Sequence, residues 1–134
     1  MAVVDASVIL SGMLPNDPRH EASKAWLIAL ASSGDCFSAP AILLSEVAAP
    51  LSRAYNLPEI AKEVVQTLAT APFAKIVPVS MPLANRAAVI AADYQIRGCD
   101  AVYVALAEAL GEKLITLDKQ QGERARDVVE IFQI

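Results

Sequence analysis

Short apolar runs alternate along the chain with longer segments in which apolar residues recur every three or four positions. Short runs are typical of buried strands, and the longer spacing is typical of helices that cover a sheet. The pattern predicts strands at residues 2–5, 36–38, 75–79, 113–117 and 128–132. It predicts helices at residues 6–13, 20–32, 41–55, 58–71, 82–95 and 100–110, and a short helix around Glu123.

Strands that alternate with helices favour an α/β fold: a three-layer α/β/α sandwich around a central, mainly parallel sheet of about five strands. No repeat or linker interrupts the pattern, so residues 1–134 are predicted to form a single domain. Segment 58–71 carries more apolar surface than a peripheral helix needs, which fits either core packing or contact with a second copy. The face of helix 20–32 predicted to be buried consists of Ala22, Ala25, Trp26, Ala29 and Leu30.

Four acidic residues, Asp5, Glu46, Asp100 and Asp118, stand against or inside apolar runs. A carboxylate in such surroundings needs a counter-charge or takes up a proton, and none of the four runs contains Lys or Arg. A shared divalent cation is the simplest counter-charge, and oxygen ligands suit Mg²⁺ or Mn²⁺. Asp5 and Asp118 stand at the carboxyl ends of two predicted strands, and parallel sheets bind ligands beyond the carboxyl ends of strands.

Three of these acids also have ordinary structural explanations. Asp5 fits equally well as the N-cap of the next helix, and Asp100 as a cap or dipole partner of its helix. Asp118 ends a strand, where turn aspartates are frequent. Glu46 is the most diagnostic, because it lies at the margin of an apolar helical stripe rather than on the opposite face.

Composition narrows the class of protein. The net charge of −4 argues against a protein that holds nucleic acid by bulk electrostatics, but a bound metal would offset part of the local negative charge. Cys36 and Cys99 lack CxxC spacing, which favours a reduced, cytoplasmic environment. No apolar run reaches the length of a membrane span. Lone His20 is interpreted as a surface residue rather than a catalytic base.

Four ordered motifs resemble the PIN domain family, and most closely its VapC-type toxins. They are Val3-Val4-Asp5-Ala6-Ser7, Leu44-Ser45-Glu46-Val47, Gly98 to Ala107, and Leu114-Ile115-Thr116-Leu117-Asp118. The resemblance implies a central parallel sheet, Mg²⁺ or Mn²⁺ dependence, endoribonuclease activity on RNA, a homodimer and a VapB-type antitoxin partner. It maps Asp5, Glu46, Asp100 and Asp118 onto the acidic quartet that holds the metal and is catalytic. Ser7 and Thr116 are expected to hydrogen-bond to these acids or to water.

Three other functions stay open. A phosphatase of the haloacid dehalogenase type also begins with a strand ending in aspartate, but the second aspartate of that motif is here Ser7. A non-catalytic interaction module with the same fold is a second alternative, which the four acids disfavour. The third is a PIN nuclease that is not a toxin and acts in RNA processing or on DNA.

Overall fold

The strands form one parallel sheet with a reversal of strand order in its middle. The computed structural model describes all 134 residues, and its strands pair in the order β3-β2-β1-β4-β5, every pair parallel. The sheet confirms the predicted α/β class and five-stranded core. The strands are β1 (Ala2–Val4), β2 (Phe37–Pro40), β3 (Ala74–Val77), β4 (Lys113–Ile115) and β5 (Ile131–Phe132).

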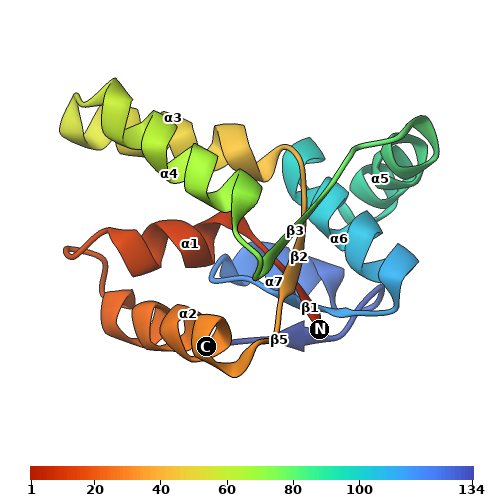
Figure 1. The fold of residues 1–134 in the computed structure, drawn as a ribbon. Coiled ribbons are helices and arrows are strands. Elements are labelled where there is room, and N and C mark those ends of the chain that lie inside the picture. Colours follow the sequence, from red (N-terminus) through yellow and green to blue (C-terminus); the bar gives the residue numbers. More distant parts are fainter.

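Seven helices surround the sheet. In Figure 1, α1 and α2 lie to the left of the strands, and α5 and α6 lie to the right. Helix α6 packs against β1, β2 and β4. Because seven of its residues are buried, its sequence is an almost continuous apolar run. None of the helices combines the length and the apolar character that crossing a membrane requires. The helices are α1 (Ala6–Met13), α2 (His20–Ser33), α3 (Leu43–Tyr55), α4 (Pro58–Thr70), α5 (Met81–Tyr94), α6 (Gly98–Leu110) and α7 (Lys119–Ala125).

The reversal of strand order falls between β1 and β4. From β1 the chain adds β2 and then β3 on one side, and β4 returns to pair with the other side of β1. The pairing continues one residue past β1, where the backbone N–H of Asp5 donates to the carbonyl of Ile115 at 3.0 Å. Ligands of open parallel sheets bind at such a reversal, beyond the carboxyl ends of the strands. Asp5 therefore stands at the place where a site is expected.

The predicted buried face of α2 is confirmed for Trp26 and Leu30, which are half-buried and pack against the core, but it is wrong for its three alanines. Ala22, Ala25 and Ala29 are exposed, and the one fully buried residue of the helix is Ser23. The reason is a close approach between α1 and α2 at Gly12. A Cβ atom added to Gly12 would lie 2.6 Å from Cδ1 of Leu27 and within 4 Å of the Ser23 backbone. Because Gly12 has no side chain, α2 packs closely against α1 through Ser23 and Leu27 rather than through its alanines.

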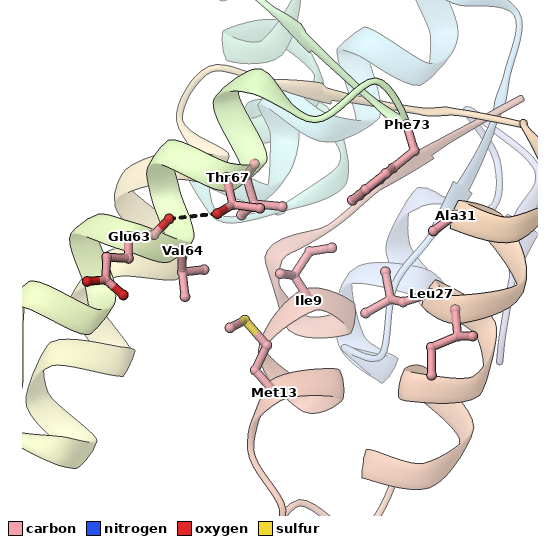
Figure 2. A pocket seen from close by; sticks show the side chains of 10 residues that line it. Ile9, Met13, Leu27, Ala31, Glu63, Val64, Thr67 and Phe73 are labelled. Carbon is pink, nitrogen blue, oxygen red and sulfur yellow. Dashed lines mark hydrogen bonds between the residues drawn. The ribbon is translucent and has the colours of Figure 1, made fainter.

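Helix α4 uses its apolar residues in two ways. Ala61 and Leu68 are buried in the core, whereas Val64 is half-buried and Ile60 is 45% exposed. Val64 and Thr67 face α1 and α2 across an apolar cleft of about 420 Å³ (Figure 2). Eight of its ten lining residues are hydrophobic, so it forms a continuous apolar surface open to solvent. Its lining residues are Ile9, Met13, Leu27, Ile28, Ala31, Glu63, Val64, Thr67, Leu68 and Phe73.

Candidate active site

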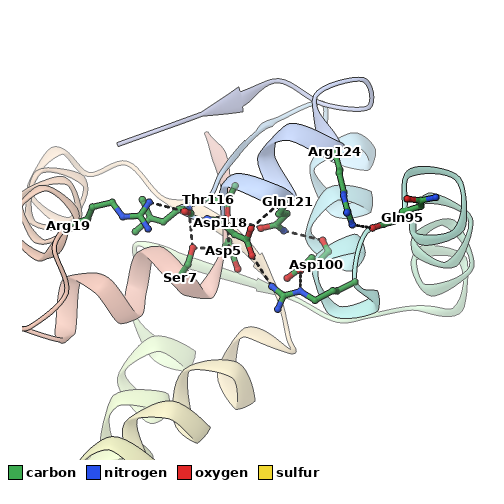
Figure 3. A network of polar contacts seen from close by, with 11 residues as sticks. Asp5, Ser7, Arg19, Gln95, Asp100, Thr116, Asp118, Gln121 and Arg124 are labelled. Carbon is green, nitrogen blue, oxygen red and sulfur yellow. Dashed lines mark hydrogen bonds and ion pairs between the residues drawn. The ribbon is translucent and has the colours of Figure 1, made fainter.

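The four acids singled out in the sequence line a single cleft. Asp5 follows β1, Glu46 lies in the first turn of α3, Asp100 lies in the first turn of α6, and Asp118 precedes α7. The cleft has a volume of about 670 Å³, and two arginines, Arg53 and Arg97, also line it. Figure 3 shows Asp5, Asp100 and Asp118 in one polar network, each from a different element. Segments that are up to 113 residues apart in sequence thus meet at the strand-order reversal.

Asp5 occupies the N-cap position of α1 but does not act as a cap. Its side chain makes no capping hydrogen bond, which removes the ordinary explanation for this residue. Instead, Oδ2 of Asp5 accepts hydrogen bonds from Ser7 Oγ at 2.8 Å and from Thr116 Oγ1 at 2.7 Å. Burial is the largest influence on this carboxyl and raises its pKa; the charge of Asp100 raises it further, against the lowering effect of the two hydroxyls.

The hydroxyl of Thr116 lies between two oxygen acceptors, one on Asp5 and one on Gln121. Thr116 Oγ1 lies 2.7 Å both from the Asp5 carboxylate and from Oε1 of Gln121. The amide of Gln121 is oriented by its donation to the carbonyl of Asp100 at 3.3 Å. The threonine hydroxyl has one hydrogen and cannot donate it to both oxygens. Its single hydrogen therefore serves only one of Asp5 and Gln121 at a time, which couples the Asp5 carboxylate to Gln121.

Glu46 is held in the cleft by a tyrosine of another helix. Tyr103 of α6 is fully buried, and its hydroxyl donates to Glu46 Oε2 at 2.5 Å. Burial raises the pKa of Glu46, and the nearby charges of Asp5 and Asp100 raise it further. The pKa of Tyr103 is also raised, first by burial and then by its bond to Glu46, so the phenol keeps its proton as donor. The mutual influence of Asp5, Glu46 and Asp100 indicates one electrostatic cluster.

Asp100 and Asp118 share one cation of the chain, Arg97. The guanidinium donates from Nε to Asp100 Oδ2 at 2.7 Å and from Nη2 to Asp118 Oδ2 at 2.9 Å. These bonds, with Asp100 the larger contributor, raise the pKa of Arg97 above its usual value. The other oxygen of Asp118 accepts the backbone N–H of Gln121 at 3.0 Å and caps α7. Asp118 is therefore both a helix cap and a member of the acidic cluster.

Two further contacts fix the loop after β4. Ser7 Oγ accepts the backbone N–H of Leu117 at 3.0 Å, while it donates to Asp5. Arg19 donates to the Leu117 carbonyl at 2.8 Å. Both predicted supporting residues, Ser7 and Thr116, thus contact the acids and join the ends of β1 and β4. This bracing keeps Asp5 and Asp118 on the same side of the sheet.

The cleft fits a hard divalent cation in its chemistry. Carboxylate oxygens are the ligands that Mg²⁺ and Mn²⁺ prefer, and burial of Asp5 and Glu46 disfavours their charged forms unless positive charge is added. The side chains are not arranged as a preformed cage, because no three acidic, histidine or cysteine side chains converge on one point. Asp100 and Asp118 instead accept hydrogen bonds from Arg97, and Glu46 accepts one from Tyr103. A few carboxylates with open positions suit Mg²⁺, which keeps several of its waters.

Sequence reasoning missed three residues of the site. It did not single out Arg97, Tyr103 or Gln121. The spacing held a signal, because residues three positions before and after Asp100 share its helical face. His20 was also misjudged as a surface residue: its side chain is 12% exposed and hydrogen-bonds through Nδ1 to the Ser11 carbonyl at 2.9 Å.

The fold and the cleft define an α/β protein with an acid-lined site at a strand-order reversal. The family model for the PIN domain matches residues 2–127, and the chain belongs to that family. This assignment excludes the alternative of a haloacid dehalogenase-type phosphatase. No curated protein sequence matches the chain.

Several solved structures have a similar fold over nearly the whole chain. FitAB bound to an IR36 DNA fragment is 23% identical, with a TM-score of 0.72 over 99% of this chain and 94% of the other. FitAcB from Neisseria gonorrhoeae is 25% identical, with a TM-score of 0.69 over 98% and 96%. A toxin–antitoxin complex from Klebsiella pneumoniae is 18% identical, with a TM-score of 0.67 over 90% and 89%.

Proposed function

We propose that this protein is a Mg²⁺- or Mn²⁺-dependent endoribonuclease and the toxin of a VapBC-type toxin–antitoxin pair. The observation that carries the proposal is the meeting of Asp5, Glu46, Asp100 and Asp118 in one cleft at the strand-order reversal. Membership of the PIN domain family supports a nuclease. RNA as the substrate rests on the resemblance of the four motifs to VapC-type toxins.

In this proposal Asp5 and Asp100 hold the principal cation, and Glu46 and Asp118 complete the site directly or through water. A bound Mg²⁺ or Mn²⁺ would lower the pKa of a water and offset charge on the leaving oxygen of a phosphodiester. Ser7 and Thr116 orient the Asp5 carboxylate through their hydroxyls. Tyr103 orients Glu46, which lines the cleft, and bonds to only one of its two carboxylate oxygens.

An antitoxin partner is supported by two observations. The similar solved structures include one toxin–antitoxin complex, and FitAB and FitAcB share the fold over nearly the whole chain. The chain also exposes the apolar cleft between α2 and α4, which lies beside the acidic cleft because α1 lines both. Growth arrest on expression, relieved by a small protein encoded beside the toxin, would support the toxin role; normal growth would favour a nuclease that acts in RNA processing.

A homodimer and a cytoplasmic location belong to the same proposal. Exposed large apolar side chains on α5 and α6, at Met81, Val89 and Leu110, offer surface for contact between two copies. Their exposed fractions are 71%, 47% and 38%. Light scattering of the purified protein would give the mass of the particle, and a monomer at micromolar concentration would contradict the dimer.

A cleavage assay on total RNA tests the activity. Wild type and Asp100→Ala are compared in Mg²⁺, in Mn²⁺ and in EDTA. We expect cleavage only by the wild type and only with a cation present. Cleavage by Asp100→Ala at the wild-type rate, or undiminished cleavage in EDTA, would contradict the assignment. Glu108→Ala is a matched control, because Glu108 also lies on α6 but pairs with Arg86 outside the cleft.

A further inference from the structure

Arg97 bonds to two acids of the cleft although its side chain is largely exposed to solvent. It lies at the N-cap position of α6, directly before the turn that carries Asp100. Its guanidinium bridges two acids of the cluster from different elements, yet its side chain is 72% exposed. A guanidinium has five N–H donors, and the two bonds to carboxylates leave three of them available.

The two acids that Arg97 contacts are also two of the four proposed cation ligands. Asp100 Oδ2 and Asp118 Oδ2 each accept one guanidinium N–H. Their Coulomb attraction to Arg97 competes with their attraction to a divalent cation in the same cleft, since the positive charges repel each other at short range. The side chain of Arg97 is exposed enough to move away without breaking core contacts.

We propose that Arg97 exchanges partners: it bonds to Asp100 and Asp118 in the structure described here, and it binds a substrate phosphate once these two acids hold a cation. The inference rests on the proposed nuclease function. Guanidinium groups bind phosphate and carboxylate with the same two-pronged geometry, so one side chain can serve both partners. The Arg97 guanidinium is thus free to bind the substrate phosphate only when a cation occupies the site.

Arg53 and Arg86 supply matched comparisons. Arg53 lines the same cleft but bonds to a backbone carbonyl of its own helix, at 3.4 Å, instead of to an acid of the cluster. Arg86 makes two hydrogen bonds to Glu108, at 2.6 and 2.7 Å, outside the acidic cleft. Loss of Arg53 removes positive charge without freeing a carboxylate of the cluster, and loss of Arg86 frees a carboxylate that is not part of it.

The first test is the affinity for Mn²⁺ without any nucleic acid, measured by titration calorimetry. For Arg97→Ala we expect a dissociation constant about five- to tenfold lower than for wild type, because two partly exposed ion pairs no longer have to be broken. Arg53→Ala and Arg86→Ala should stay within about twofold of wild type. Unchanged or weaker Mn²⁺ binding by Arg97→Ala would overturn the exchange and indicate that Arg97 only positions the acids.

The second test follows binding of a labelled phosphorothioate oligoribonucleotide as a function of salt. With Mn²⁺, Arg97→Ala should reduce the slope of log K against log salt by about 0.7, the value for one lost phosphate contact on a single strand. In EDTA the slopes of wild type and Arg97→Ala should agree. A slope change of the same size with and without Mn²⁺ would overturn the exchange. Because neither test requires cleavage, failure of the nuclease proposal alone would leave both readouts interpretable.

Discussion

The hydroxyl of Tyr103 donates to Oε2 of Glu46 across 2.5 Å, and this bond ties α6 to α3 at the wall of the acidic cleft. The tyrosine is fully buried, whereas the glutamate is half-buried and faces the cleft. The phenol fixes one carboxylate oxygen and leaves the other for a ligand.

Tyr103→Phe should lower the free energy of unfolding by about 1 kcal/mol, the usual net value of one hydrogen bond. The loss in free energy of unfolding stays moderate because Glu46 can hydrogen-bond to water in the cleft instead. The variant should also raise the pKa of Glu46 further, since the tyrosine bond lowers it. Urea unfolding and a ¹³C-detected titration of Glu46 measure the two effects. Tyr94→Phe is the control, because the Tyr94 hydroxyl makes no hydrogen bond within the chain; an equal loss in both variants would contradict the role of Tyr103.

Asp5→Asn should stabilise the fold at neutral pH in EDTA. Burial raises the pKa of Asp5 in the folded protein, so the folded state binds a proton more readily than the unfolded state does. Wild type therefore gains stability as the pH falls through the folded pKa, and the gain is complete below the ordinary value of 3.8. Asn cannot ionise, so the extra free energy of unfolding of Asp5→Asn over wild type should be largest above the folded pKa of Asp5. It should decrease as the pH falls below that pKa.

Urea unfolding at a series of pH values checks this prediction. Asp93→Asn is the control, because Asp93 is exposed on α5 and its substitution should change the free energy of unfolding by only about 0.5 kcal/mol or less. A difference between Asp5→Asn and wild type that is constant from neutral to acid pH would mean that the Asp5 carboxyl is not destabilised by its burial.

Mg²⁺ or Mn²⁺ should raise the melting temperature of the protein. A ligand that binds only the folded state at 100 times its dissociation constant adds about 2.7 kcal/mol, which corresponds to several degrees for a chain of this size. Thermal scans in Mg²⁺, Mn²⁺ and EDTA measure the shift. Glu46→Gln should reduce it, and Asp5→Asn combined with Asp100→Asn should abolish it. An undiminished shift in the double variant would mean that the cation binds elsewhere.

Gly12→Val should destabilise the protein by about 1–3 kcal/mol, the range for an overpacked contact. A Cβ at residue 12 would lie 2.6 Å from Cδ1 of Leu27, so the Leu27 side chain would have to turn away. The two further methyl groups of valine would then press on the α2 backbone, which already lies at contact distance at Ser23 and Lys24. Ala22→Val, on the exposed side of α2, should cost only a few tenths of a kcal/mol of helix propensity. Chemical denaturation compares the two. Equal losses in both variants would show that α1 and α2 do not depend on the close approach at Gly12.

The periodicity of the sequence predicted the elements and the location of the acids well, because buried strands and helices carry distinct apolar spacing. Strand ends were less accurate: the predicted strand 113–117 ends at Ile115, because Thr116 and Leu117 leave the ladder to contact Ser7 and Asp5. The burial of Ser23 in place of the alanines of α2 could not be predicted, since it depends on where Gly12 of another helix lies. Charges shared across the fold, such as Arg97 with Asp118, depend on topology in the same way.

The most direct test of the central claim is the binding of Mn²⁺ by wild type and by four single variants: Asp5→Asn, Glu46→Gln, Asp100→Asn and Asp118→Asn. Calorimetry without nucleic acid isolates the cation site from cleavage. If the four carboxylates form one site, wild type binds Mn²⁺ and each substitution of a direct ligand weakens it at least about tenfold, as loss of a ligand or its support usually does. Affinities that are the same in wild type and all four variants, or no binding by wild type, would contradict the account.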